Sequence, residues 1–196
     1  MNIANRLTLL RICLIPVFII ILLAEPAWGS LQLAGVAIPG HQAIAGLIFA
    51  FASLTDFLDG YLARKYQLVT NFGIFFDPMA DKLLVLAAMI ILSSFQWIPA
   101  WVVIIIVSRE LMVTGLRVLL ANSNGKVMAA ALPGKIKTAT QMFAILFYLF
   151  NDFGLSPQSN PHRLADILIY ICLFFTVYSG VEYFWKGRFV FNESPS

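Results

Sequence analysis

The sequence predicts an all-α membrane protein, a bundle of six transmembrane helices with both termini in the cytoplasm. Its 196 residues are 60% hydrophobic and only 12% charged, with a mean hydropathy of +0.86, which lies outside the usual composition of soluble domains. The apolar residues fall into six stretches, and about 20 apolar residues suffice for a helix to cross a bilayer. We therefore expect residues 1–196 to form one membrane domain.

The first three spans are expected at about 9–24, 43–65 and 75–94. Residues 1–8 are short and amphipathic, which predicts a segment in the membrane interface ahead of the first span. Pro16 can be accommodated inside that span if neighbouring groups satisfy the freed backbone carbonyl. Residues 24–42 contain prolines and glycines but no lysine or arginine, so they are expected to form a loop.

The last three spans are expected at about 98–120, 139–151 and 164–185. A tight turn at 95–101, which overlaps the start of the fourth span, carries Trp97, Pro99 and Trp101, and tryptophan is typical of a membrane interface. Residues 121–138 contain several lysines together with Pro133 and Gly134, which indicates a loop.

The basic residues lie almost entirely on one side of this arrangement. If six spans alternate, Arg163 alone falls clearly on the outer side, and the following residues share the other side: Arg6, Arg11, Arg64, Lys65, Arg117, Lys126, Lys135, Lys137, Lys186 and Arg188. Positively charged loops stay in the cytoplasm. Both termini are therefore expected there, and the net charge of +3 is assigned to topology rather than to nucleic-acid binding.

Four carboxylates lie between Asp56 and Asp81, at the cytoplasmic ends of the second and third spans. Residues three or four positions apart share a helix face, so Asp56 pairs with Asp59, and Asp77 with Asp81. A short connection makes the two helices antiparallel neighbours. Four facing carboxylates would repel one another unless cations or protons neutralised them, and hard divalent cations prefer such oxygen ligands.

Small residues and one arginine accompany the carboxylates. Gly60 and Ala63 continue the Asp56 face, Gly73 precedes Asp77 by about one turn, and Arg64 supplies a guanidinium suited to phosphate. Together with the carboxylates, these residues suit a magnesium-bound pyrophosphate, which needs bridging metals and a close backbone approach.

This pattern resembles the signature of the CDP-alcohol phosphotransferases, integral membrane enzymes of phospholipid synthesis, at every fixed position: Asp56-x2-Asp59-Gly60-x2-Ala63-Arg64-x8-Gly73-x3-Asp77-x3-Asp81. The resemblance implies two divalent ions, Mg²⁺ or Mn²⁺, held by the four aspartates, with Asp81 also serving as the general base. It implies a nucleotide pocket for the cytidine diphosphate group formed by Thr8, Asp56, Gly60, Ala63, Arg64 and Gly73. It further implies a homodimer in a bacterial cytoplasmic membrane, with the active site facing the cytoplasm.

Shorter motifs extend the resemblance from Asn2 to about Gln141 and are similar to the branch of the family whose acceptor is glycerol 3-phosphate: Asn2-Ile3-x-Asn5-x2-Thr8-x2-Arg11, Ser108-Arg109-Glu110, Leu116-Arg117 and Gly134-Lys135-x-Lys137-Thr138. The implied reaction is attack of the primary hydroxyl of sn-glycerol 3-phosphate on the lipid-side phosphorus of CDP-diacylglycerol, with release of CMP. Thr8 fits equally well as the N-cap of the first span.

The acceptor phosphate needs its own cationic pocket, and the dense supply of cations on the cytoplasmic face is Arg109, Arg117, Lys135 and Lys137. Each of these could instead set topology or contact anionic lipid. Glu110 is expected to pair with a nearby cation. Lys82 is expected to extend toward the interface or, alternatively, to moderate the carboxylates.

Two alternatives remain open at this stage. Inositol phosphate, serine or phosphatidylglycerol could serve as the acceptor, because family members that use them share the carboxylate motif and charge cannot separate inositol phosphate from glycerol 3-phosphate. An ion-coupled transporter would also keep carboxylates in the membrane, although transporters place them near the midplane, often with internal repeats.

Overall fold

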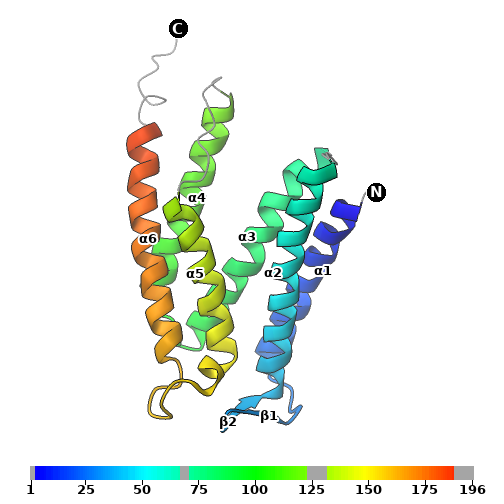
Figure 1. Ribbon diagram of the computed structural model, residues 1–196, viewed down its shortest axis with the longest axis vertical. Coiled ribbons are helices and arrows are strands. Elements are labelled where there is room, and N and C mark those ends of the chain that lie inside the picture. Colours follow the sequence, from blue (N-terminus) through cyan, green and yellow to red (C-terminus); the bar gives the residue numbers. More distant parts are fainter. Residues whose placement is uncertain (1–2, 67–70, 123–131, 188–196) are drawn as a thin grey trace.

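Six long α-helices and a two-stranded hairpin make up the described part of the fold (Figure 1). The computed structural model describes residues 3–66, 71–122 and 132–187, without the side chains of 3–8, 56–66, 71–81, 117–122 and 186–187. The elements are α1 (Ile3–Ala24), β1 (Ser30–Leu33), β2 (Val36–Pro39), α2 (Gly40–Tyr66), α3 (Asn71–Ser94), α4 (Ala100–Asn122), α5 (Leu132–Leu149), the 3₁₀-helix η1 (Asn151–Gly154) and α6 (Arg163–Gly187).

The helices run up and down the long axis of the molecule. Helix α1 packs against α2 and α3, while α6 packs against α4 and α5. Contacts of α5 with α2 and α3, and of α3 with α4, join the two groups of helices. The start of α1, the end of α2 and the end of α6 lie at the same end of the bundle, and the hairpin lies at the opposite end (Figure 1).

Three elements differ from the sequence-based expectations. Helix α1 begins at Ile3 and continues unbroken to Ala24, so residues 3–8 belong to the first helix and Thr8 lies within it, not at its N-cap. The expected loop at 24–42 contains β1 and β2, paired antiparallel around Ala34 and Gly35. Both of those residues have positive φ angles, 50° and 82°, which is the backbone conformation that a two-residue hairpin turn favours.

The largest difference is at α5, which begins at Leu132 rather than near residue 139. Pro133 indicated a loop, but a proline in the first turn of a helix loses no hydrogen bond and fits the required φ angle. Lys135 and Lys137 therefore lie on a helix, so their side chains leave α5 in different directions. The predicted loop location of these two lysines is wrong.

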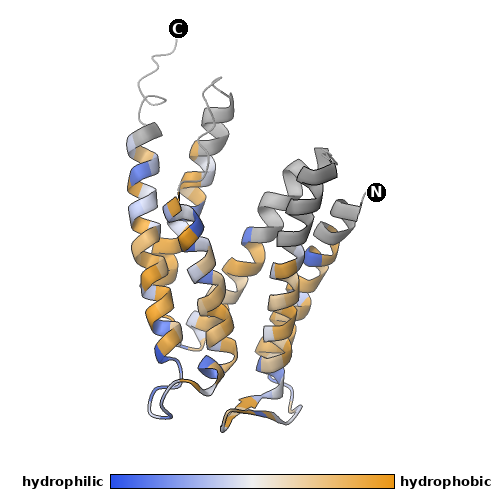
Figure 2. Cartoon of the chain, viewed as in Figure 1, coloured by the Kyte–Doolittle hydropathy of each residue, from blue (hydrophilic) through white to orange (hydrophobic). Residues whose placement is uncertain are grey.

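Apolar side chains fill the interior of the bundle and also cover its outside. Phe18 and Phe49, with ring centroids 6.1 Å apart, are fully buried between α1 and α2. Side chains on the outward faces are just as apolar, and several of them are more than half exposed: Ile20, Leu47, Ile104, Leu111 and Phe174. Figure 2 shows this apolar character along the helices. Soluble monomers rarely expose such continuous apolar surface.

Within the described residues, one helix is long and apolar enough by itself to cross a membrane, over Arg163–Trp185 of α6. Shorter apolar helical stretches lie at Leu9–Ala24, Gly40–Thr55 and Lys82–Ser94. In α2 and α3 the apolar stretch adjoins the segment that carries the predicted carboxylates.

Asp152 holds the connection between α5 and α6 together. Its carboxylate is fully buried and accepts hydrogen bonds from the backbone N–H groups of Leu164 (2.7 Å) and Ala165 (3.0 Å) and from the Ser156 hydroxyl. The first N–H groups of a helix lack partners within the helix, and a negative charge there is favourable. Asp152 thus caps α6 from a distance in the sequence, with its own φ angle at 53°.

An aromatic cluster lies beside the connection between α5 and α6. Trp97 lies 4.5 Å from the His162 ring and 6.5 Å from the Tyr148 ring, between ring centroids. The Tyr148 hydroxyl donates a 2.7 Å hydrogen bond to Asp166. Burial lowers the pKa of His162 below its ordinary value, against the opposing effect of Asp152 and Asp166. His162 is therefore neutral at pH 7, and its ring can pack against its aromatic neighbours.

Replacing Asp152 with alanine should lower the free energy of unfolding by about 2–4 kcal/mol, because three hydrogen bonds to a buried carboxylate are lost. Asp152→Asn should cost less, since asparagine keeps an acceptor and tolerates a positive φ angle. Thermal unfolding of the detergent-solubilised protein measures both, with the exposed Gln158→Ala as the control from the same loop. Equal stability of the alanine variant and the control would contradict the capping role.

Candidate functional site

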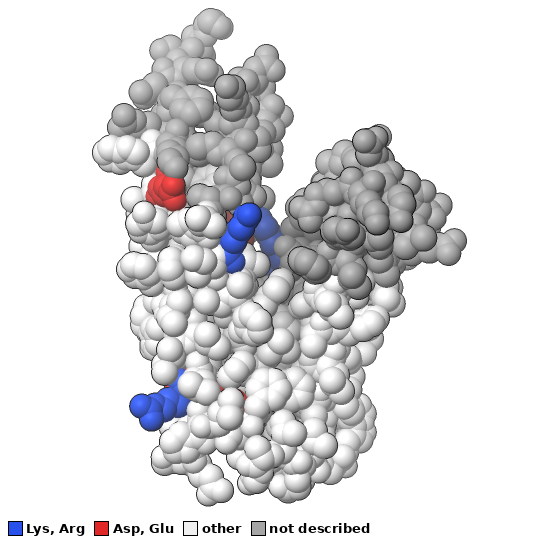
Figure 3. All heavy atoms as spheres, viewed as in Figure 1, with Lys and Arg blue, Asp and Glu red and all other residues white. Residues whose placement is uncertain are grey.

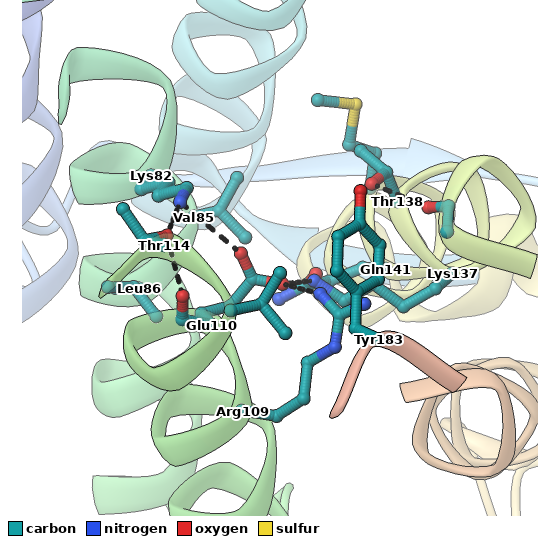
Figure 4. Close-up of a pocket in the computed structure, with 13 residues that line it drawn as sticks. Lys82, Val85, Leu86, Arg109, Glu110, Thr114, Lys137, Thr138, Gln141 and Tyr183 are labelled. Carbon is teal, nitrogen blue, oxygen red and sulfur yellow. Dashed lines mark hydrogen bonds and ion pairs between the residues drawn. The ribbon is translucent and has the colours of Figure 1, made fainter. Parts of the chain in front are cut away.

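A polar cavity of about 200 Å³ lies among α3, α4, α5 and α6 (Figure 4). It is lined by Lys82, Val85, Leu86, Arg109, Glu110, Val113, Thr114, Gly134, Lys137, Thr138, Gln141, Met142 and Tyr183. Four helices thus contribute to one site, and it forms only when the bundle is assembled.

Glu110 is the carboxylate at the centre of this cavity. Its Oε1 accepts a hydrogen bond from Lys137 Nζ and lies 3.3 Å from Arg109 Nη1, while its Oε2 lies 3.9 Å from Lys82 Nζ. The side chain of Glu110 is 14% exposed and that of Lys137 is 4% exposed. Charges this poorly solvated need partners, and Glu110 joins cations from α3, α4 and α5 (Figure 4).

Arg109 is fixed by contacts on both sides. Its Nη2 donates a 2.7 Å hydrogen bond to Ser179 Oγ on α6, and its Nε is buried without a hydrogen-bond partner in the described residues. Gly180 makes room for the arginine, because a Cβ atom there would lie 3.1 Å from Arg109 Cγ. Helix α6 thereby sets the position of a charge carried by α4.

Lys82 reaches from α3 to α4. Its ammonium donates a hydrogen bond to Thr114 Oγ1, and Thr114 in turn donates a 2.6 Å hydrogen bond to the backbone carbonyl of Glu110. The expected extension of Lys82 toward the membrane interface is wrong, since the side chain points into the cavity (Figure 4).

The electrostatic character of the cavity is cationic. Among the described residues that line it, Lys82, Arg109 and Lys137 carry positive charges and Glu110 one negative charge, which leaves a net charge of +2. Figure 3 shows basic side chains gathered midway along this face of the molecule. Arginine and lysine donors in a partly buried pocket are suited to binding an anion, and a phosphate above all.

The four residues predicted to bind the acceptor phosphate are divided by the structure. Arg109 and Lys137 line the cavity, and their binding of the acceptor phosphate stays a prediction. Lys135 is exposed on α5 and is not among the lining residues. Arg117 lies on α4, and its side chain lies outside the described part of the structure.

Sequence reasoning did not assign three polar groups of the cavity to the site, namely Lys82, Glu110 and Tyr183. Its expectation that Glu110 pairs with a nearby cation is confirmed. Lys82 follows the predicted base Asp81 directly in α3, and Glu110 follows Arg109 in α4, so both lie beside residues that the motifs singled out. Tyr183 of α6 lies outside every motif, and no signal in the sequence indicated it.

The predicted metal and nucleotide residues lie on the helices at the same end of the bundle as the start of α1. Asp56, Asp59, Gly60, Ala63 and Arg64 belong to the last turns of α2, Gly73, Asp77 and Asp81 to the first turns of α3, and Thr8 to the first turns of α1. Their side chains lie outside the described part of the structure. Helices α2 and α3 contact each other, as predicted, and α1 packs against both.

An all-carboxylate donor set on two neighbouring helices suits Mg²⁺ or Mn²⁺, which prefer oxygen ligands. Among the side chains that the structure describes, no group of three His, Cys, Asp or Glu residues could hold a metal ion. Asp81 directly precedes the cavity residue Lys82 on α3, so the backbone places the carboxylate segment next to the cationic cavity.

Comparison with known proteins gives consistent matches. A sequence model described as CDP-alcohol phosphatidyltransferase matches residues 1–178. The chain is 50% identical, over 95% of both chains, to a CDP-diacylglycerol–glycerol-3-phosphate 3-phosphatidyltransferase of Bacillus subtilis. It is 39% identical to a probable phosphatidylglycerophosphate synthase of Mycobacterium tuberculosis, over 93% of this chain and 79% of the relative. It is 36% identical to a Haemophilus influenzae protein with the same name as the Bacillus relative, over 93% and 91% of the two chains.

Proposed function

The chain belongs to the CDP-alcohol phosphatidyltransferase family, and we propose that it transfers the phosphatidyl group of CDP-diacylglycerol to sn-glycerol 3-phosphate, giving phosphatidylglycerol phosphate and CMP. Family membership makes the chain an enzyme, so the transporter hypothesis is set aside. The observation that carries the choice of a phosphorylated acceptor is the cationic cavity beside the carboxylate segment. The names of the relatives from Bacillus subtilis and Haemophilus influenzae support glycerol 3-phosphate among such acceptors.

In this proposal the cavity binds the phosphate of the acceptor. Arg109 and Lys137 are nearly buried and come from different helices, so they can contact different oxygens of one phosphate. Serine, which carries no phosphate, would leave the net charge of +2 of the described lining residues uncompensated. Phosphate bound between α4 and α5 would direct the glycerol part toward α3, where Asp81 precedes Lys82.

Asp56, Asp59, Asp77 and Asp81 would hold two divalent ions, and Mg²⁺ or Mn²⁺ fits their oxygen donors. When bound, such ions neutralise the pyrophosphate and stabilise the charge that develops on CMP as it departs. Thr8, Gly60, Ala63, Arg64 and Gly73 would surround the nucleotide, where the glycines allow a close approach and Arg64 supplies a cation.

Asp81 would accept the proton of the primary hydroxyl of the acceptor. The hydroxyl oxygen then forms a bond to the lipid-side phosphorus, and the bond from that phosphorus to the oxygen of CMP breaks. Lys82 is the next residue and already contacts α4, so the base and the phosphate site are connected through one short piece of α3. Positioning of the two reactants in this way is a large part of catalysis of phosphoryl transfer.

We place the whole chain, 1–196, in the bacterial cytoplasmic membrane as one domain with six spanning helices. The continuous apolar outer surface supports contact with lipid, and the excess of basic residues at the carboxylate end supports a cytoplasmic active site. CDP-diacylglycerol can then enter from the bilayer while the soluble acceptor arrives from the cytoplasm. A homodimer completes the proposal, on the basis of the family resemblance.

The direct test is an assay of CMP release by the purified protein with CDP-diacylglycerol and a panel of acceptors. We expect metal-dependent activity with sn-glycerol 3-phosphate and at most background activity with inositol phosphate, serine or phosphatidylglycerol. Asp81→Asn should lower kcat by about 10²–10⁴-fold, as loss of a general base does. Higher activity with another acceptor would contradict the proposed substrate, and undiminished activity of Asp81→Asn would contradict the assignment of the base.

The two lysines of α5 provide a matched pair for the acceptor site. Lys137→Met should raise the KM for glycerol 3-phosphate by about tenfold or more, the loss expected for a charge-assisted hydrogen bond. Lys135→Met should change it by about twofold or less, because Lys135 is exposed outside the cavity. Steady-state kinetics at saturating CDP-diacylglycerol measures both, and equal effects of the two substitutions would show that the cavity is not the acceptor site.

A further inference from the structure

We propose that Glu110 is a positioning residue that holds three cations in place for a dianionic phosphate monoester and sets the net charge of the cavity to match it, an inference that rests on the proposed function. Glu110 fixes both the placement of the cations around the acceptor phosphate and the net charge of the cavity.

The placement follows from the contacts of the carboxylate. Lys82, Arg109 and Lys137 come from three helices, and all three lie within 4 Å of one or other oxygen of Glu110. Like charges gathered in a poorly solvated cavity repel one another strongly. A single central carboxylate converts that repulsion into attraction, so the three cations keep a fixed arrangement before any substrate binds.

The arrangement leaves hydrogen-bond donors for a ligand. A lysine ammonium has three N–H donors and a guanidinium has five, so one carboxylate cannot use all those of Lys137 and Arg109. Arg109 Nε is buried without a partner in the described residues.

The total charge determines which anion fits. Without Glu110, the described lining residues would carry a net charge of +3, and with it they carry +2. A phosphate monoester has its second pKa near 6 and approaches two negative charges at pH 7, whereas a phosphodiester carries one. Uncompensated charge is costly in a poorly solvated site, so the +2 cavity favours the monoester.

The experiment compares Glu110→Gln, which removes the charge at nearly constant shape, with Glu25→Gln, the same change at an exposed position. The probes are sn-glycerol 3-phosphate and its methyl phosphodiester, which differ by one charge. For Glu110→Gln we expect the KM for glycerol 3-phosphate to rise about tenfold or more, because the three cations lose their common partner, and the KM for CDP-diacylglycerol to stay within about twofold. The preference for the monoester over the diester should persist, because the described lining residues then carry +3. Glu25→Gln should behave as the unsubstituted protein does.

Glu110→Asp provides a second variant in case the Glu110→Gln protein does not fold. It keeps the charge but shortens the side chain, so the preference for the monoester should persist while the KM for glycerol 3-phosphate rises. Stabilisation of each protein by glycerol 3-phosphate in thermal unfolding reports binding without turnover and should weaken in parallel with the rise in KM.

Three results would overturn the inference. A lower KM in Glu110→Gln would mean that Glu110 competes with the phosphate, and a lower kcat or stability with an unchanged KM for glycerol 3-phosphate would mean a purely structural role. Loss of the preference in Glu110→Asp would show that charge does not set selectivity. Failure of the proposed function is distinguishable, because the unsubstituted protein would then not use glycerol 3-phosphate.

Discussion

The pairing of buried charge is the constraint on which the rest of this structure depends. An apolar bundle can keep Lys137, Arg109 and Glu110 in its interior only if each has a partner. Glu110 satisfies that condition for α4 and α5 together, and Ser179 and Gly180 of α6 accommodate Arg109. Packing of α5 against α6 and of α4 against α6 therefore serves to assemble a cationic cavity as well as to bury apolar surface.

The two chemical parts of the proposed reaction occupy different helices and meet at α3. Helices α2 and α3 carry the carboxylate segment, while α4, α5 and α6 supply most of the cavity. The junction between them is the pair Asp81 and Lys82. A lipid substrate and a soluble phosphate can thus approach one site from different groups of helices, and the acceptor is chosen by residues outside the carboxylate motif.

The sequence predicted the six helices well because apolar stretches of this length have few alternatives. It placed the start of α5 wrongly because a proline such as Pro133 fits the first turn of a helix as well as it fits a loop. The lysines that follow do not show the hydrophobic periodicity that would have indicated a helix. Arg11 was counted among the charges that flank a span, yet its side chain is nearly fully buried. The motifs located Arg109 and Lys137 but gave Glu110 no role in the site, since a carboxylate in an anion site becomes meaningful only when its three cationic neighbours are placed around it. The metal and nucleotide assignments remain predictions.

A double-substitution cycle between Glu110 and Lys137 tests most directly whether the carboxylate acts through the cations. The apparent affinity for sn-glycerol 3-phosphate would be measured for Glu110→Gln, Lys137→Met and the combined variant. If Glu110 positions Lys137, the combined loss will be smaller than the sum of the single losses by about 1 kcal/mol or more. Losses that add within about 0.5 kcal/mol would show that the two residues act independently and would contradict this account of the site.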